Sequence, residues 1–274
     1  MSNRLLCLAL TTTLALALVG CSALAPIPEQ QPVQPPGDGH AATVVSLASC
    51  WPGLPLLQQV VAEAEAEHPD VVYQLIGTHS AQAEVMLRNG EVSLVLIAVP
   101  VSDPPKGERI ALDLQVPIVP ASSLLESIAL EDAIALLGGY RLDWSELHAG
   151  AGRPEIVVRE TGSVGRQVFE ATVMANAGIT RAARLLPNDG AIIDHVAAHP
   201  LAIGIVSRAW LDDRVREVEL VPLDGAKPVG QATIAIELLL APAADAATRD
   251  LADSLASRQG RRLIEQRYRL PDAR

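Results

Sequence analysis

The stretch "VVRETGSVG", Val157 to Gly165, decides how the rest of the chain is interpreted. An arginine ends an apolar run, and a serine in a small-residue turn precedes "RQVFEATVMANAG", a helical pattern. The first N–H groups of a helix have no partner within it and carry the positive end of its dipole. Arg159 and Ser163 therefore predict an anion site at this turn. A simpler alternative stays open, in which Ser163 caps the helix and Arg159 is a surface side chain.

Outward from this stretch, the sequence alternates between strand and helix patterns. Short apolar runs rich in β-branched residues predict strands at 42–48, 71–77, 92–99, 110–119, 155–158, 201–206, 218–223 and 231–241. Helical spacing of apolar residues predicts helices at 54–70, 80–90, 129–139, 166–178 and 189–200, and a closing pair of helices within 246–268. Strands separated by single helices imply an α/β fold with parallel units covered on both faces. Ligands in such folds bind beyond the carboxyl ends of the strands.

The N-terminal residues predict export. Arg4 precedes a long apolar run that ends in "LVGC", Leu18 to Cys21, which is typical of a secretory signal. This ending resembles the bacterial lipobox, in which the cysteine becomes the lipid-modified first residue. The alternative, a membrane-spanning helix, wants about 20 apolar residues, more than the run provides. We expect a signal peptide at 1–20, lipidation at Cys21 and a Pro-rich tether at 21–40.

The composition fits a globular protein held at a membrane surface. The formal net charge is -11, which argues against nucleic acid as a partner. With Cys7 removed and Cys21 lipidated, only Cys50 is left, so no disulfide framework is expected. No later apolar stretch is long enough to span a bilayer. We expect a monomer on the extracytoplasmic face, in the periplasm or at the cell surface.

Six segments in order resemble the phosphate-binding protein of bacterial phosphate ABC transporters. The chain is similar to that family over nearly all of 41–270. The segments that carry the resemblance are "CWPGLP" at 50–55, "GTHSAQAEVMLRNGEV" at 77–92, "YRLDWSEL" at 140–147, "RETGSVGRQVFEATV" at 159–173, "HVAAHPLAIGIVS" at 195–207 and "LADSLASRQGRRLIEQ" at 251–266.

The resemblance implies a two-lobed type II periplasmic-binding-protein fold. Each lobe would be a mainly parallel sheet flanked by helices. Lobe 1 would comprise 41–118 and 231–274, and lobe 2 would comprise 119–230. The chain would cross between the lobes near Gln115–Pro120 and again near Gly225–Gln231.

The resemblance also implies the ligand-binding residues. In the family, the first loop gives a small hydroxyl residue and an aromatic one, and the second gives a serine. The third segment gives the arginine, a serine and the two residues after it. The corresponding positions here are Cys50, Trp51, Ser80, Arg159, Ser163, Val164 and Gly165. Phosphate or a related oxyanion would be the ligand, and an ABC transporter permease the partner.

Several positions depart from the family pattern. Cys50 is a poor donor where a hydroxyl is usual, and Val164 and Gly165 replace Gly-Thr. Ala98 stands where many members have an aspartate that accepts the proton of phosphate. Without this acceptor we expect weak discrimination between phosphate and sulfate, although Asp103 could substitute.

Other chemistries are less well supported by the residues. Thr161 excludes a Gly-x-Ser-x-Gly nucleophile motif, and an inert buried thiol is favoured over a nucleophile at Cys50. His195 and His199 lie four residues apart and could share a metal, but no third ligand is evident, so a solvated helix surface is favoured. His79 could line the cleft or lie at a loop tip. We expect no enzyme, no cofactor and no metal.

Two functions remain open. The first is a lipid-anchored receptor that captures an oxyanion, with phosphate expected, and delivers it to an importer. The second is a binding-fold surface protein that has lost phosphate specificity and serves as a sensor or docking module. Cys50, Ala98 and Val164 favour the second function.

Overall fold

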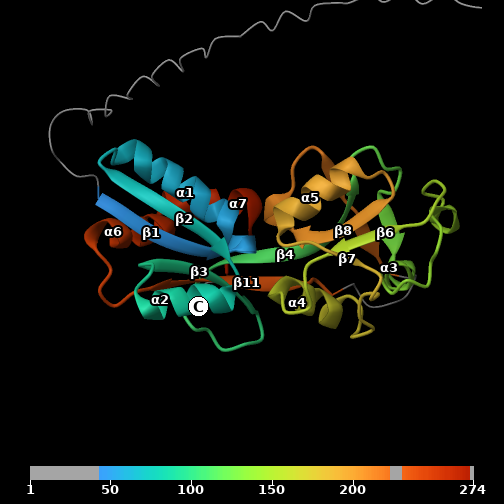
Figure 1. Ribbon diagram of the computed structural model, residues 1–274, viewed down its shortest axis with the longest axis horizontal. Coiled ribbons are helices and arrows are strands. Elements are labelled where there is room, and N and C mark those ends of the chain that lie inside the picture. Colours follow the sequence, from blue (N-terminus) through green and yellow to red (C-terminus); the bar gives the residue numbers. More distant parts are fainter. Residues whose placement is uncertain (1–42, 223–229, 272–274) are drawn as a thin grey trace, which may run out of the picture. The chain divides into compact units, whose positions relative to one another are not determined.

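Two groups of parallel strands, joined by antiparallel strands, form a mixed sheet with helices on both faces (Figure 1). This computed structural model describes residues 43–222 and 230–271, which belong to one compact unit, His40–Arg274. The predicted signal peptide, Cys21 and the tether lie outside the described residues. Among the helices of the described part, none is long and apolar enough to cross a membrane.

The first half of the sheet follows the order β2-β1-β3-β11-β4. The bounds of its elements are β1 Thr43–Cys50, η1 Trp51–Gly53, α1 Leu54–Glu67, β2 Val71–Thr78, α2 Ser80–Asn89, β3 Leu94–Pro100, β4 Glu108–Pro120, β11 Thr233–Leu240, α6 Ala246–Ala256 and α7 Arg258–Arg267. Strands β1, β2 and β3 pair in parallel. Helices α1, α6 and α7 cover one face, and α2 covers the other (Figure 1).

The second half continues as β4-β8-β6-β7, with β9 also paired to β4. The bounds of its elements are α3 Leu130–Leu137, η2 Trp144–Leu147, β6 Glu155–Val158, α4 Val164–Thr172, β7 Arg184–Leu185, α5 Asp189–Ala198, β8 Ala202–Ser207, η3 Arg208–Trp210 and β9 Val215–Glu217. Strand β6 pairs in parallel with β7 and β8. A separate pair is formed by β5 Ser127–Ala129 and β10 Glu219–Val221.

Strand β4 belongs to both halves. Up to Leu114 it pairs with β11, and from Gln115 onward it pairs with β8. Both pairings are antiparallel, so the sheet is less purely parallel than the sequence predicts. The return of the chain at 230–232 leads directly into β11, which also pairs with β3.

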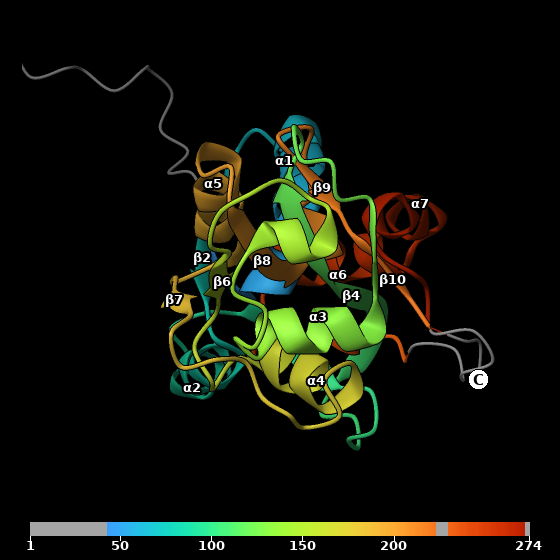
Figure 2. The ribbon, with the colours of Figure 1, turned by 90° about the vertical axis from the view of Figure 1, so that its right-hand side faces the viewer.

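Alternation along β6 explains why helices cover both faces of the second half. Ile156 and Val158 lie in the apolar cluster with α3 and α4, whereas Val157 between them lies in the cluster with α5. Side chains of a strand point to opposite faces in turn. Figure 2 shows the result, with α5 on one side of β8 and β6 and with α3 and α4 on the other.

The predicted α/β architecture is confirmed, but one local prediction needs correction. The helix predicted at 166–178 runs from Val164 and ends at Thr172, because Ala175 and Asn176 adopt positive φ angles of 46° and 65°. Such angles do not continue a right-handed helix. Within the segment 140–147, the structure has a short 3-10 helix, η2, which begins with a capping box formed by Asp143 and Glu146.

Phe169 is the only phenylalanine of the chain and the largest fully buried side chain of the second half. We expect Phe169→Ala to lower the free energy of unfolding by about 3–5 kcal/mol, because it removes apolar contacts and leaves a cavity. The matched control is Leu124→Ala, at an 80% exposed residue, which we expect to change stability by no more than about 0.5 kcal/mol. Urea unfolding measures both, and equal effects would contradict the packing described here.

Candidate functional site

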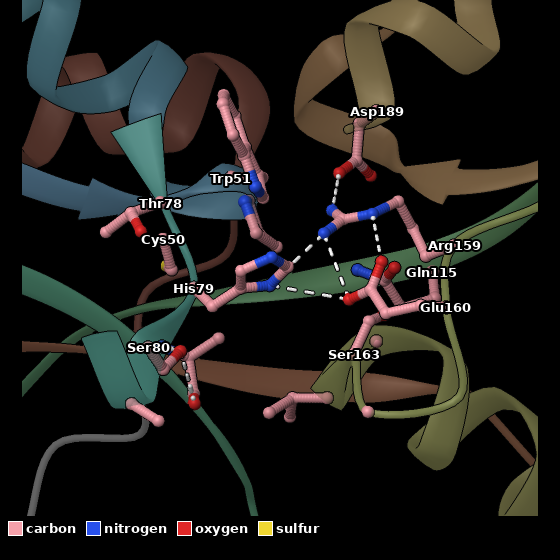
Figure 3. Close-up of a pocket in the computed structure, with 16 residues that line it drawn as sticks. Cys50, Trp51, Thr78, His79, Ser80, Gln115, Arg159, Glu160, Ser163 and Asp189 are labelled. Atoms are coloured by element: carbon pink, nitrogen blue, oxygen red, sulfur yellow. Dashed lines mark hydrogen bonds and ion pairs between the residues drawn. The ribbon is translucent and has the colours of Figure 1, made fainter. Parts of the chain in front are cut away.

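A pocket of about 350 Å³ lies where the carboxyl ends of strands from both halves meet. From the first half it is lined by the turns after β1 and β2 and by the end of β3, and from the second half by β4, the turn after β6 and the start of α5 (Figure 3). The residues predicted to bind a ligand all line it, namely Cys50, Trp51, Ser80, Arg159, Ser163, Val164 and Gly165. Segments more than a hundred residues apart in sequence are thus brought together.

Arg159 directly follows β6 and is only 6% exposed, so it is not the surface side chain of the simpler alternative. Its Nη1 donates to Oδ2 of Asp189 at 3.1 Å. Its Nε and Nη2 donate to the two carboxylate oxygens of Glu160, each at 3.2 Å. Figure 3 shows the guanidinium between these two acids. Two opposite charges compensate the buried cation, as burial requires.

His79 approaches the same group from the first half of the sheet. Its Nδ1 lies 3.5 Å from Nη2 of Arg159 and 3.4 Å from Oε1 of Glu160. His79 precedes α2 as its N-cap residue and lines the pocket. Of the two positions considered for His79 in the sequence, the structure shows the one in the cleft.

Asp189 was not identified as a site residue from the sequence. It is the first residue of α5 and is 2% exposed. Its Oδ1 accepts from the backbone N–H of Ser207 at 2.8 Å. Burial raises the pKa of Asp189, and the Arg159 guanidinium opposes that rise. In the sequence, the feature that could have identified Asp189 is its place as an acidic residue in the first turn of a predicted helix. Acidic residues are also common at the starts of helices that bind nothing.

Gln115 on β4 is a second site residue that sequence reasoning missed. Its Nε2 donates to Oδ2 of Asp113 at 2.8 Å, so the amide oxygen points the other way. A Cβ on residue 165 would come within 2.3 Å of that oxygen, so the present position of the Gln115 amide depends on the glycine at 165. The amide of Gln115 thus fills the space that the family's side chain would take at 165. Burial and the charge of Asp189 raise the pKa of Asp113 well above its usual value.

Both predicted serines have structural roles in the pocket wall. Ser163 is the N-cap of α4, and its Oγ accepts from the backbone N–H of Arg166 at 3.2 Å. The hydroxyl of Ser80 donates to the carbonyl oxygen of Ala98 at 3.1 Å and accepts from the Ala98 N–H at 2.9 Å. Ser80 therefore ties the start of α2 to β3, and only Ser163 keeps a hydroxyl proton free to donate.

The first loop is fixed by aromatic contacts. Trp51 packs against Gly77, where a Cβ would come within 2.6 Å of the indole ring. The carbonyl oxygen of Trp51 accepts from Nε1 of Trp210 at 2.8 Å, which connects the loop to the second half. Cys50 is 2% exposed, and burial raises the pKa of its thiol to about 12.

Two other residues lie elsewhere. Asp103, considered as a substitute acceptor, lines a different pocket near Arg269, so it does not take the place of the aspartate missing at Ala98. Trp144 is 3% exposed and packs in the apolar core of the second half. Ala98 itself lines the main pocket.

A model of one protein family, described as the LysR substrate binding domain, matches residues 39–260. No curated protein sequence matches the chain.

Solved structures share the fold at low sequence identity. A putative phosphate ABC transporter substrate-binding protein from Clostridium perfringens, solved with bound phosphate, is 19% identical at a TM-score of 0.68, covering 84% of this chain and 100% of that one. An ABC-type phosphate transport receptor from Vibrio cholerae is 16% identical at a TM-score of 0.57, and the match covers 83% of this chain and 100% of that one. The regulatory domain of OxyR2 from Vibrio vulnificus is 15% identical at a TM-score of 0.53, and the match covers 83% of this chain and 100% of that one.

These matches confirm the two-lobed type II periplasmic-binding fold expected from the sequence. Both solute receptors and regulatory domains have this fold. Assignment to the phosphate-binding proteins in particular therefore stays a prediction.

The buried thiol gives a test of the site geometry. With a pKa of about 12, roughly one Cys50 in ten thousand is a thiolate at pH 8, and the group is shielded from solvent. We expect Cys50 to resist iodoacetamide in the native protein and to react fully in urea. Mass spectrometry of the Cys50 peptide distinguishes the two states. Rapid labelling under native conditions would mean that the loop is open and that the thiol is a reactive group.

Proposed function

The chain belongs to the family of LysR substrate binding domains, and on that premise we propose that it is a receptor that captures an inorganic oxyanion, namely phosphate. The proposed activity is binding without catalysis. The lipobox-like ending at Cys21 supports a lipid anchor on the extracytoplasmic face, and delivery to an ABC importer is part of the proposal. The observation that carries it is the meeting of helix starts and one buried guanidinium, from both halves, in a single pocket.

The pocket offers several donors to an anion. The first N–H groups of α4, at Val164 and Gly165, have no partner within the helix and carry the positive end of its dipole. The free hydroxyl proton of Ser163 lies at the same turn. Trp51 adds a buried Nε1 that has no hydrogen-bond partner among the described residues. A buried donor without a partner calls for an acceptor, and a ligand oxygen would supply one.

Glu160 indicates how the guanidinium would bind an oxyanion. Its carboxylate takes the Nε and Nη2 edge of Arg159 with two parallel hydrogen bonds, which is the geometry in which arginine binds phosphate. A ligand would replace this carboxylate at the guanidinium. The Glu160 side chain is 37% exposed, so it can rotate toward solvent.

Acceptors in the pocket favour an oxyanion that carries a proton. The amide oxygen of Gln115 is directed toward Gly165 because its Nε2 is bound to Asp113. Asp189 adds a second acceptor, because its carboxylate faces the pocket while it accepts from Arg159 and from the backbone of Ser207. Hydrogen phosphate can donate to such groups, whereas sulfate has no proton to donate. These groups would replace the acceptor missing at Ala98, so we propose a preference for phosphate over sulfate that is stronger than the sequence suggested.

A sensor or docking module is the second candidate function. The family match and the likeness to the OxyR2 regulatory domain favour it, as does the carboxylate already bound to Arg159. In that case the pocket would take a different small molecule or none.

Thermal unfolding of the full chain with phosphate tests the proposal. A ligand at a hundredfold excess over its dissociation constant stabilises by about 2.7 kcal/mol, so we expect a clear rise in melting temperature with phosphate and a smaller one with sulfate. Arg159→Ala should abolish the rise because it removes the bidentate donor.

Arg159→Ala also leaves Asp189 buried without its partner, so equilibrium dialysis at a temperature where the variant is folded provides a second measurement. The matched control is Arg88→Ala, at a 65% exposed arginine on α2, which should bind like the wild type. The absence of any shift with either anion would refute oxyanion capture and favour the second candidate.

Glu160→Gln tests whether the carboxylate competes with the ligand. Hydrogen bonds to charged groups contribute about 1.5–3 kcal/mol, so removing the charge of Glu160 should raise phosphate affinity by roughly tenfold or more. Calorimetric titration measures the change, with Glu91→Gln at an exposed acid of the first half as the control. A lower affinity would instead show that Glu160 accepts the proton of the bound anion.

A further inference from the structure

Three metal-ligating side chains meet outside the pocket, in the second half of the sheet. Glu155 is the first residue of β6, His195 lies in the last turn of α5, and His199 is the residue that caps α5. One possible ligand atom of each lies within 4.8 Å of the others. The sequence showed the two histidines four residues apart but no third ligand. The fold supplies it, because β6 pairs beside β8, which follows α5 directly.

The ring nitrogens of both histidines suit a metal ion. Nδ1 of His199 lies 2.7 Å from the carbonyl oxygen of His195, which can only accept, so Nδ1 carries the proton and Nε2 keeps a lone pair. Nε2 of His195 lies 3.2 Å from Oε2 of Glu155. Apart from this carboxylate, the buried nitrogen has no hydrogen-bond partner among the described residues. A buried nitrogen without a partner calls for an explanation.

The surroundings attract a cation. Both histidines lie at the C-terminal end of α5, where the helix dipole is negative, and Glu155 adds a carboxylate. Nε of Arg184 donates to Oε1 of Glu155 at 2.6 Å, which orients the carboxylate and leaves Oε2 facing His195. Groups that orient a ligating carboxylate in this way are a regular part of metal sites.

We propose that Glu155, His195 and His199 bind one divalent transition-metal ion of the zinc class. Two imidazoles and a carboxylate, with water in the fourth position, are a donor set that Zn²⁺ accepts. The ring centroids of the two stacked histidines lie 3.8 Å apart, and for both Nε2 atoms to bind one ion, with Zn–N bonds of about 2.0–2.1 Å, one ring must turn out of the stack. Rotation of the exposed His199 side chain provides this adjustment. The site is independent of the oxyanion proposal, since α5 carries Asp189 at its other end.

Calorimetric titration of the metal-free full chain with Zn²⁺ tests the site, with Co²⁺ absorption as a second readout of coordination. We expect His199→Ala to weaken Zn²⁺ binding at least about tenfold, and Glu155→Gln to weaken it as well, because each removes one ligand. His199 is exposed, so its variant should fold normally, and circular dichroism verifies this. Mg²⁺ serves as the hard-cation control, since imidazole ligands do not favour it.

The matched control variant is His68→Ala, because His68 caps α1 as His199 caps α5 but has no histidine four residues before it. It should bind Zn²⁺ as tightly as the wild type. The proposal is overturned if the wild type binds no Zn²⁺, or if binding is unchanged in a folded His199→Ala variant. It is also overturned if His68→Ala weakens binding as much as His199→Ala does.

Discussion

The buried guanidinium of Arg159 is the group on which the site depends. A cation that is only 6% exposed needs compensating charge, and the chain provides it from two directions. Asp189 comes from the start of α5 and Glu160 from the turn before α4. The positions of these two helix starts are therefore linked through one side chain. The N–H groups at the start of α4 face the same pocket because this turn is fixed there.

The two acids differ in their freedom to move. Asp189 is enclosed and also bound to the backbone of Ser207, so its carboxylate is held in place beside the arginine. Glu160 is partly exposed and adjoins its partner in sequence, so its carboxylate can leave without any change of the backbone. Capture of an anion would then be an exchange of one oxyanion for another at the same donors. In such an exchange the number of charge-assisted hydrogen bonds at the guanidinium stays the same.

Much of the fold and of the pocket could be predicted from the sequence, because apolar periodicity and turns record local structure directly. The segment at Arg159 to Gly165 and the loops at Cys50 and Ser80 meet in the pocket as expected. The sequence could not show which side chains fill the space between them. Gln115 and Asp189 belong to a strand and a helix whose local patterns were assigned correctly, and only tertiary packing directs them to the site. Glu155 was missed in the same way, since its distance from His195 depends on strand order.

Strand β4 changes its pairing strand beside the pocket, at the point where it passes from one half of the sheet to the other. Leu114 is in register with Thr233 of β11 and Gln115 with Ser207 of β8, while the N–H of Gln115 still donates to the carbonyl oxygen of Ala232, so a relative rotation of the halves would bend the chain in this region. Gln115 lies at this point of the strand, and its side-chain amide donates a hydrogen bond to Asp113, two residues earlier in the chain. A rotation of the halves by a few degrees would therefore change the direction of the Gln115 amide oxygen, which faces Gly165. The same residue, Gln115, would then take part both in ligand recognition and in the relative movement of the two halves.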